Sequence, residues 1–560
     1  MKHKYILGAM AAVSLMNTAC SDFLDTVPHD ALSPETTWKT EADAEKFLIG
    51  CYSGWMDDGV AWYADCGSDI GYGQFQHEGW YYIGNGGMYA GAPTHEVHDF
   101  FQFNTIRNCN DFLENIKDVP FTDETKKTQM IGQVKTIRAW QYFEKNWYYG
   151  GVPIIDSYAT AEEAQVPRNT EEEVKKFFYD ELDEAIPMLK GLSLTEGGRI
   201  NQGVALAIKM RSALYYGDLE RARGAAAEIM KMGYELEPST PGTASGYEKL
   251  FRLNGKNSKE IIFAVQHDQT VLSSYIAILL NNNGSGGWSS IVPTQNLVDM
   301  YEMNNGLTKD ENGSSYDATH PFANRDPRMA LTILYPGRDW ETLDGEATVI
   351  NTLDKEVLNK ENKKEKNIDY PTAEDNSSKT GLSWAKYVGD SPNYYADIWN
   401  EDINTIMFRY AEVLLTWAEA ENELNGPSDE VYSVLNEIRN RANMPKVDRS
   451  KYATRETLRE LIRRERTVEL AGEGFRRADI LRWKDVQGKM LAETVLDGDL
   501  KCITGTLDYT QDNPELRAKI DPKDKWMLVE KRVFKPHNRY LPIPQVYRDK
   551  NPNLKQNEGY

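Results

Sequence analysis

Residues 202–232, QGVALAIKMRSALYYGDLERARGAAAEIMKM, contain two alanine-rich helical segments joined by only two residues. The first segment is Gln202–Tyr216, the second is Leu219–Met232, and Gly217-Asp218 separates them. So short a connection makes two helices run antiparallel, side by side. The stretch therefore predicts a helical hairpin and indicates a mainly α protein.

Further helices are expected on both sides of this hairpin, because apolar residues recur there at helical spacing. They are predicted at Val97–Ile116, Glu124–Tyr148, Thr170–Leu189, Ile406–Leu424, Asp429–Ala442 and Arg455–Ala471. Another helix should begin near Thr40 and place Cys51 on its buried stripe. Paired helices with alanine-rich contact faces are typical of tetratricopeptide-like arrays, although no strict repeat is present.

The second half of the fold is predicted to be irregular. From about residue 281 to 400 the sequence is rich in Gly, Asn, Asp, Ser and Lys, and no helical or strand period is sustained. Ile261–Val265 is apolar and suits a short strand. We expect helix pairs packed against a loop-rich half with few short strands.

Composition excludes several classes of protein. The 560 residues carry a net charge of −22, whereas a nucleic-acid-binding protein needs a basic surface. Five cysteines show no CxxC and no metal-ligand spacing, so neither a disulfide scaffold nor a zinc site is predicted. The 31 tyrosines and 13 tryptophans are unusual, and such rings offer both an apolar face and a polar edge.

The first twenty residues, MKHKYILGAMAAVSLMNTAC, predict export and lipid attachment. Lys2 and Lys4 precede an apolar run that is too short to span a bilayer, and the residues before Cys20 resemble a bacterial lipobox. We therefore expect a lipoprotein signal peptide at 1–19, a lipidated tether at 20–39 and one domain at 40–560. Its helical scaffold would cover about 40–270 and 400–485, and its loop-rich region about 281–400. The alternative is a plain secretory signal with an incidental cysteine.

One loop is the strongest candidate for a binding site. Gly67–Pro93, GSDIGYGQFQHEGWYYIGNGGMYAGAP, holds eight glycines and six aromatic rings, and neither a helical nor a strand period runs through it. Rings in such a loop must either pack or bind a ligand. We expect it to form one wall of a sugar-binding site; the alternative is that its rings fold back onto nearby helices.

Motifs for catalysis, metals or cofactors are not supported. His95 and His98 are three residues apart rather than in HExxH, Asp310–Gly313 lacks the later ligands of a calcium loop, and Gly84–Gly87 has no phosphate-binding context. No GxSxG is present. The sequence therefore predicts no catalytic residue, metal or cofactor, although a carboxylate pair stays possible among 86 acidic residues.

Arg463–Leu470, RRERTVEL, places several charges on a helix that also has an apolar stripe. Glu465 and Glu469 are four residues apart, and the arginines can reach carboxylates on neighbouring helices. A buried, salt-bridged clamp is the preferred interpretation, and ligand binding is the alternative.

Several segments in this order resemble the SusD/RagB family of surface glycan-binding lipoproteins of Bacteroidetes. They are CSDFLD at Cys20–Asp25, RAWQYFEKNWYYGGVPII at Arg138–Ile155, GRINQGVALAIKMRSALYYGD at Gly198–Asp218, PTQNLVDMYEMNNG at Pro293–Gly306, ANRDPRM at Ala323–Met329, FRYAEVLLTWAEAENEL at Phe408–Leu424, RRERTVELAGEGFRRADILRWK at Arg463–Lys484 and RYLPIPQVYRDKNPNLKQNEGY at Arg539–Tyr560. The match covers nearly the whole chain.

The resemblance implies four tetratricopeptide-like helix pairs and a location on the cell surface, anchored through Cys20 to the outer membrane. It also implies a partner, a SusC-like TonB-dependent outer-membrane transporter, to which a polysaccharide or oligosaccharide would be delivered. In family members, rings from a loop after the first helix and from loops around the PTQ segment form an aromatic arc. Trp80, Tyr81 and Tyr82 occupy the first position here, and Trp288 occupies the second.

A pyranose ring stacks on aromatic faces, and its hydroxyl groups need polar partners, which Asp69, Asn85 and Asn283 of the same loops could supply. Weaker aromatic and polar candidates are Trp340, Trp399, Trp62, Tyr63 and Asp65. Two other functions remain open: a surface glycoside hydrolase or esterase, and a lipoprotein that captures peptides or another nutrient.

Overall fold

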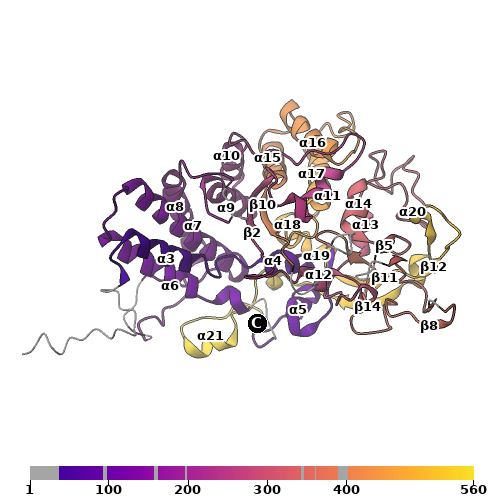
Figure 1. Cartoon of the computed structure of the whole chain (residues 1–560), viewed down its shortest axis with the longest axis horizontal. Coiled ribbons are helices and arrows are strands. Elements are labelled where there is room, and N and C mark those ends of the chain that lie inside the picture. The colour runs from indigo at the N-terminus through magenta and orange to yellow at the C-terminus, as the bar shows by residue number, and fades with distance from the viewer. Residues whose placement is uncertain are drawn as a thin grey trace, which may run out of the picture.

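Paired helices form one half of the molecule, and loops with short strands form the other (Figure 1). The computed structural model describes residues 37–92, 98–156, 160, 162–195, 198–341, 346–359, 361–388 and 401–560. The lipid-attachment prediction at Cys20, with the signal peptide and most of the tether, lies outside these residues.

The first helices pack as the apolar stripes predict. Helix α3 (Glu41–Tyr52) begins at a capping box, in which the side chains of Thr40 and Asp43 each accept the other's backbone N–H. Its buried stripe, which includes Cys51, faces α6 (Asn104–Asn115). Helix α7 (Glu124–Tyr149) then packs against both α6 and α8 (Glu171–Met188).

The hairpin predicted at residues 202–232 is confirmed as α9 (Gln202–Tyr215) and α10 (Leu219–Ile229). Gly217 has a φ of 75°, and the Asp218 carboxylate accepts the Arg221 N–H at 3.2 Å, so the two-residue turn both ends α9 and starts α10. Helix α10 packs on α15 (Tyr410–Asn425), which contacts α16 (Asp429–Arg441) and α17 (Arg455–Glu469). The mainly α, paired-helix fold is confirmed.

Two predicted helices begin later than expected. Within the predicted helix Val97–Ile116, α6 begins at Asn104 and follows a separate 3-10 helix at His98–Phe101. Residues 406–409, expected in a helix, belong to strand β10 (Thr405–Arg409), which pairs antiparallel with β2 (Ile261–Val265). All five β10 residues are buried, and pairing with β2 satisfies their backbone groups where the apolar run alone suggested a longer α15. The strand predicted at Ile261–Val265 is confirmed.

The remaining elements are short and lie mostly in the loop-rich half. The helices are α4 (Asp58–Tyr63), α5 (Trp80–Asn85), α11 (Ser245–Leu250), α12 (Ile276–Leu280), α13 (Gln295–Met300), α14 (Pro327–Thr332), α18 (Arg476–Arg482), α19 (Ala492–Val495), α20 (Pro514–Arg517) and α21 (Gln545–Lys550). The strands form further two-stranded antiparallel pairs: β1 (Gly71–Gly73) with β3 (Ile291–Pro293), β4 (Ile333–Leu334) with β9 (Ser383–Trp384), β5 (Asp339–Glu341) with β6 (Ala347–Val349), β7 (Glu356–Leu358) with β8 (Lys364–Lys366), β11 (Gly498–Cys502) with β14 (Met527–Arg532), and β12 (Gly505–Leu507) with β13 (Ala518–Ile520).

A buried ionic network joins the two halves. Arg409 of β10 forms ion pairs with Glu260 at 2.8 Å, Glu469 at 2.8 Å and Glu473 at 2.7 Å. Arg328 of α14 reaches Glu469 at 2.9 Å. The charged clamp predicted around residues 463–470 is therefore confirmed as buried structure, with each cation held between carboxylates.

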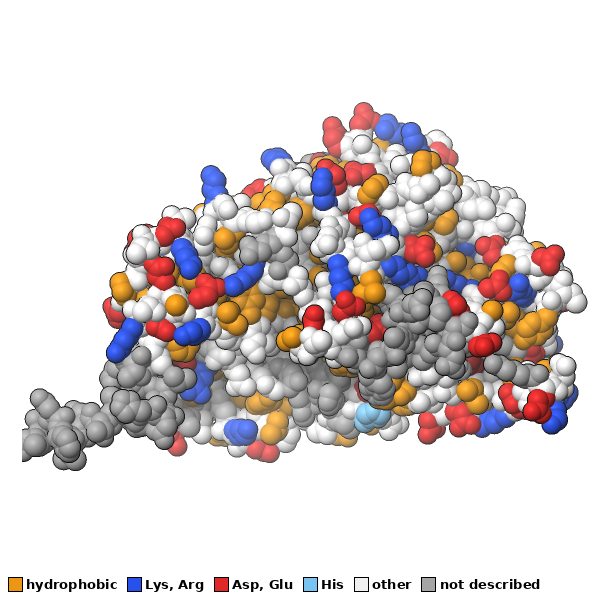
Figure 2. Space-filling model, viewed as in Figure 1, with side chains coloured by type: hydrophobic (Ala, Val, Ile, Leu, Met, Phe, Trp, Pro, Cys, Tyr) orange, Lys and Arg blue, Asp and Glu red, His pale blue; other side chains and the backbone are white. Residues whose placement is uncertain are grey.

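The surface is of mixed charge. On the face shown in Figure 2, acidic and basic side chains are scattered over both halves, and hydrophobic side chains lie singly or in small groups between them. Within the described ranges, every helix is too short or too polar to serve as a membrane span.

Candidate functional site

The two loops singled out from the sequence meet in the structure. Strand β1 of the first loop pairs with β3 of the second, and Tyr72 lies opposite Val292. Close approach of the backbone explains the glycine at position 71, because a Cβ there would lie 2.5 Å from the carbonyl oxygen of Asp65. Residues more than 200 positions apart are thus brought to one surface.

Gln74 ties three segments together at this surface. Its side-chain amide donates to the carbonyl oxygens of Trp288, at 3.3 Å, and Asp375, at 3.2 Å, and its side-chain oxygen accepts the Lys379 N–H at 3.2 Å. Its own backbone N–H donates to the Ser290 carbonyl at 3.1 Å. These bonds fix the backbone that carries Trp288.

The loop before Trp288 is held from below by a carboxylate. Asp369 accepts from the Asn282 side chain and from the Gly284 N–H, both at 2.7 Å, while the Asn283 side chain donates to the Ile368 carbonyl at 3.2 Å. Burial raises the pKa of Asp369, and the hydrogen bonds from this loop counteract part of that rise. Trp288 itself is partly buried against the core.

Three tyrosines continue the aromatic surface from the first loop. We call Tyr81, Tyr82 and Tyr89 the tyrosine ridge. Their ring centroids are 5.3 Å apart between Tyr81 and Tyr82 and 6.0 Å between Tyr82 and Tyr89, and each pair meets edge to face. Tyr81 and Tyr82 are partly exposed, and Tyr89 is 50% exposed. Tyr81 also contacts the buried Tyr72 at 6.4 Å, which anchors the ridge to β1.

Helix α5 explains which rings face outward. Its inward face carries Trp80, Ile83 and Gly84, which are buried at helical spacing, whereas Tyr81 and Tyr82 are partly exposed. We expected the many glycines to prevent a helix in this loop, and that prediction is wrong at α5. Gly79 and Gly86 lie just outside this helix and have positive φ angles of 81° and 77°.

Trp80 needs a correction. We expected its ring to be available to a ligand, but its exposure is 0% and it belongs to the main hydrophobic core. It is the first residue of α5, and its Cβ lies close to Gly73 of β1, as does the side chain of Cys66. In this conformation Trp80 supports the surface from beneath and offers it no face.

The predicted polar partners are already engaged. Asp69 is 3% exposed and binds the Arg476 guanidinium through both oxygens, at 2.8 and 2.9 Å. The Asn85 side-chain oxygen accepts the Gly87 N–H at 2.8 Å, although Asn85 remains partly exposed, as does Asn283.

The weaker candidates are mostly core residues. Trp62, Tyr63, Asp65 and Trp340 are all buried, and Trp399 lies outside the described residues. Asp65 accepts the N–H groups of Gly472 and Arg476 at 2.8 and 2.9 Å. Burial raises the pKa of Asp65 to about 6, even though these hydrogen bonds favour its charged form.

A polar cavity of about 390 Å³ beside this surface was not foreseen. Asp69, Gln295, Leu500 and Trp526 are among its lining residues, and Leu500 packs with Tyr72 next to the ridge. The Trp526 indole N–H donates to the Asp521 carbonyl at 2.8 Å. Its lining comes from segments that are far apart in the chain, so the sequence could not predict the cavity. Its one signal in the sequence was Trp526, an isolated tryptophan among charged residues.

The described residues provide no cluster of three or more His, Cys, Asp or Glu that could hold a metal ion. His95 lies outside them, as does the side chain of His98. The described cysteines, at 51, 66, 109 and 502, are buried free thiols, and burial holds the pKa of Cys66 well above its usual value. His267 contacts the Asp58 carboxylate at 2.6 Å and the Leu272 carbonyl at 3.2 Å, so both of its ring nitrogens have oxygen partners.

Comparison with known proteins gives consistent matches. A model of the SusD family matches residues 259–560. The SusD-like protein P25 of Formosa agariphila is 24% identical over 503 residues, which cover 83% of this chain and 87% of that protein. A solved SusD-like protein from Bacteroides fragilis is 26% identical with a TM-score of 0.76, covering 95% of this chain and all of the other. A second solved structure from Bacteroides fragilis, described as a SusD-like carbohydrate-binding protein, is 27% identical with a TM-score of 0.77, covering 93% of this chain and all of the other. Because the family model spans more than half of the sequence and whole-chain structures superimpose on the same paired-helix fold, this chain belongs to the SusD family.

Proposed function

We propose that the protein binds a glycan at the surface where residues 67–92 and 281–293 meet. The observation that supports the proposal is the β1–β3 pairing, which joins the loop that carries the tyrosine ridge to the loop that carries Trp288. Gln74 contacts the backbone of Trp288, and Gln76, two residues later, lies 3.5 Å from the Tyr82 hydroxyl. Support also comes from the Bacteroides fragilis relative that is described as carbohydrate-binding.

The chemistry of this surface suits a sugar. Tyrosine and tryptophan rings stack on the C–H faces of pyranoses, and the ridge presents partly exposed rings. Asn85 and Asn283 are partly exposed, and their side-chain amides can serve hydroxyl groups; Asn85 also has Glu530 beside it. In this proposal Trp80 and Asp69 do not contact the glycan. They stabilise the surface from the core, Trp80 by packing and Asp69 by binding Arg476.

The proposal is tested with the variants Trp288→Ala and Tyr89→Ala on the best glycan from an array. Loss of an aromatic anchor at the centre of a binding site costs about 2 kcal/mol or more, and every 1.4 kcal/mol is about tenfold in affinity. We expect Trp288→Ala to weaken binding by more than about tenfold in calorimetry, and Tyr89→Ala to weaken it by less because that ring lies at the end of the ridge.

The matched control is Tyr509→Ala, which removes a tyrosine that is 59% exposed and lies on the distant β12–α20 connection. Its affinity should equal that of the wild type. Equal affinity for all four proteins would exclude this surface as the glycan site. Incubation of the same protein samples with the glycan should produce no new reducing ends, because we propose binding without catalysis. Sustained formation of reducing ends by highly purified protein would favour a hydrolase instead.

We further propose that Cys20 carries the lipid that holds the protein on the outer face of the outer membrane, where it delivers the glycan to a SusC-like TonB-dependent transporter. Family membership and the lipobox-like sequence before Cys20 support this proposal. Cys20→Ser removes the acylated thiol, so the variant should leave the membrane fraction and no longer co-purify with such a transporter. Surface labelling of the variant at the wild-type level would contradict the anchor.

A further inference from the structure

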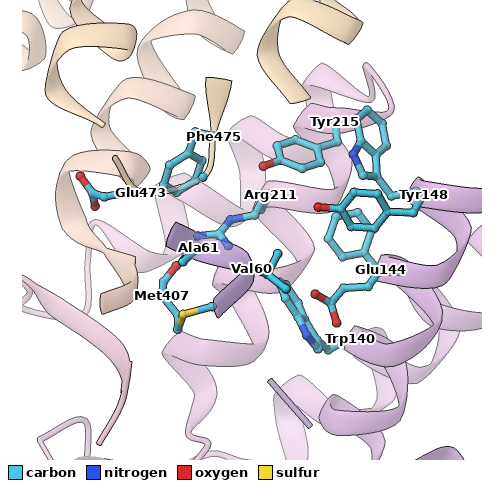
Figure 3. A pocket seen from close by; sticks show the side chains of 13 residues that line it. Val60, Ala61, Trp140, Glu144, Tyr148, Arg211, Tyr215, Met407, Glu473 and Phe475 are labelled. Atoms are coloured by element: carbon cyan, nitrogen blue, oxygen red, sulfur yellow. Dashed lines mark hydrogen bonds between the residues drawn. The ribbon is translucent and has the colours of Figure 1, made fainter. Parts of the chain in front are cut away.

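A second cavity lies inside the helical half, away from the loops described above (Figure 3). It is lined by α4, α7, α9, the β10 residue Met407 and residues 473–475, and its volume is about 60 Å³. A water molecule needs roughly 10–15 Å³ of such space, so the cavity holds about five non-hydrogen atoms. Its partly exposed lining residues, Val60, Glu144, Tyr148 and Tyr215, lead from the cavity to solvent.

The walls of this cavity are mainly aromatic. The rings come from α7, α9 and the segment before α18: Trp140, Phe143, Trp147, Tyr148, Tyr215 and Phe475. They support one another, with centroid distances of 5.6 Å for Trp140–Phe143, 5.8 Å for Phe143–Tyr215 and 4.8 Å for Trp147–Tyr215. Rings held in this way cannot collapse into the space between them, and their faces attract cations.

One carboxyl group enters the cavity without an ion-pair partner among the described residues. Figure 3 shows Glu144 between the rings of Trp140 and Tyr148. Among the described residues Glu144 has no ion pair, and the Trp140 indole N–H is the hydrogen-bond donor that faces its carboxylate. The helix neighbour Lys145 attracts the Glu144 carboxylate electrostatically but forms no ion pair with it, because its ammonium group donates to the Gln141 side chain at 2.9 Å and lies over the Phe103 ring.

The other charged groups of the cavity are already paired. Arg211 binds Glu412 through two hydrogen bonds of 2.7 Å and lies 3.9 Å from the centroid of Phe408, so its charge is compensated. Glu473 is paired with Arg409 at 2.7 Å and with Lys386 at 2.6 Å. The charge that an occupant must balance is therefore that of Glu144.

We propose that this cavity is a binding site for a small alkylated ammonium ion, with the aromatic rings around its methyl groups and the Glu144 carboxylate as its counter-ion. An aromatic cage with an acidic group is the arrangement by which proteins bind quaternary ammonium ligands. The volume corresponds to about five water-sized positions, which suits a small ion such as tetramethylammonium with its five non-hydrogen atoms. The site is independent of the proposed glycan surface, because none of the ridge residues lines it.

Titration of Glu144 gives the site a pH dependence. Burial raises the pKa of Glu144 to about 8, and Asp57 adds to the rise while Lys145, Trp140 and Arg211 oppose it. A cation requires the ionised form of Glu144, whose share of the population grows as pH rises. Apparent affinity should therefore rise from pH 7 to pH 9, with release of a proton on binding wherever Glu144 is still protonated.

Lys145 is the group most able to imitate this effect, because burial lowers its pKa to about 8 as well. The groups that face Glu144 from the surrounding elements are Asp57 before α4, Arg211 and Tyr215 of α9, Lys145 and Tyr148 of α7, and Glu473 before α18. Only a substitution of Glu144 itself separates its titration from theirs.

The test measures binding of tetramethylammonium chloride to the purified full chain by ligand-observed NMR titration from pH 6 to pH 9, with tert-butanol as the uncharged molecule of the same shape. We expect tetramethylammonium to bind more tightly as pH rises and to exceed tert-butanol by more than tenfold at pH 9. Glu144→Gln should weaken tetramethylammonium by at least tenfold at pH 9, abolish the pH dependence and leave tert-butanol unchanged.

Two further variants complete the design. Glu437→Gln is the matched control, because Glu437 of α16 also has a pKa raised by burial but lies outside the cavity; its binding should equal that of the wild type. Tyr148→Leu keeps the carboxylate and removes a partly exposed ring, so it should weaken the cation several-fold; thermal melting shows whether each variant is folded. Absence of tetramethylammonium binding to the wild type, equal binding of both compounds, or a pH dependence that persists in Glu144→Gln would each overturn the proposal.

Discussion

Asp65 and Asp69 lie four residues apart, and both carboxylates accept hydrogen bonds from residues 472–476, which lead into α18. Asp65 accepts backbone N–H groups of that segment, and Asp69 holds the Arg476 guanidinium. Glu144 differs from both because no described cation pairs with it. At the scale of single residues, the partner of a carboxylate decides whether it serves the scaffold or remains able to receive a ligand.

At the scale of elements, α5 separates structural from exposed rings within six residues. Trp80 and Ile83 enter the core, whereas Tyr81 and Tyr82 lie on the outer side and begin the tyrosine ridge. The pairing of β1 with β3 then sets the position of this helix relative to Trp288. A binding surface made of short elements therefore depends on packing beneath it.

This division predicts different results for two substitutions in α5. Trp80→Ala removes a fully buried indole and should lower the free energy of unfolding by about 3–5 kcal/mol. Tyr82→Ala removes a partly exposed ring, so it should lower stability much less and weaken glycan binding instead. Urea denaturation and calorimetry measure the two effects. Similar losses of stability in both variants would contradict the inward and outward assignment.

At the scale of the whole molecule, the buried ionic network connects the helical half with the loop-rich half. Glu469 at the end of α17 receives Arg328 of α14, Arg409 of β10 and Arg441 of α16. Removal of one member leaves buried arginine charge uncompensated, which is far more costly than loss of a surface pair. The relative placement of these elements thus depends on charge balance as well as on apolar packing.

Glu469→Gln should lower the free energy of unfolding by about 3–5 kcal/mol at pH 7. Burial alone would raise the pKa of Glu469, but Arg441, Arg409 and Arg328 lower it below its usual 4.5. Because the pKa of Glu469 is lower in the folded protein than in the unfolded chain, its ionised carboxylate stabilises the fold above about pH 4.5, and this stabilisation is lost as pH falls further. The variant has no carboxylate to protonate, so its stability should fall less steeply in acid than that of the wild type.

The control for this prediction is Asp180→Asn, which breaks the exposed pair with Lys176 on α8 and should change stability by less than about 0.5 kcal/mol. Both variants are compared with the wild type by urea denaturation at pH 7 and at pH 4. Equal stability of Glu469→Gln and Asp180→Asn would show that the network contributes no more than a surface ion pair.

The sequence by itself determined those features that arise from contacts between near neighbours. Alanine-rich segments around Gly217-Asp218 specify the α9–α10 hairpin, Thr40 and Asp43 specify the start of α3, and the apolar run Ile261–Val265 specifies β2. The aromatic and glycine-rich composition also identified the two loops that lie together, although it could not say which rings are exposed.

Only the tertiary structure decided the orientation of side chains in short irregular elements and the partners of charged groups. Trp80 and Tyr82 have the same local composition, and a six-residue helix is too short for a period to distinguish its faces; contact with β1 and the core makes the choice. The cavity around Glu144 likewise combines α4, α7, α9 and residues 473–475, which are far apart in the chain. Local pattern encodes helices because their hydrogen bonds are local, whereas burial and charge pairing depend on the packing of distant segments.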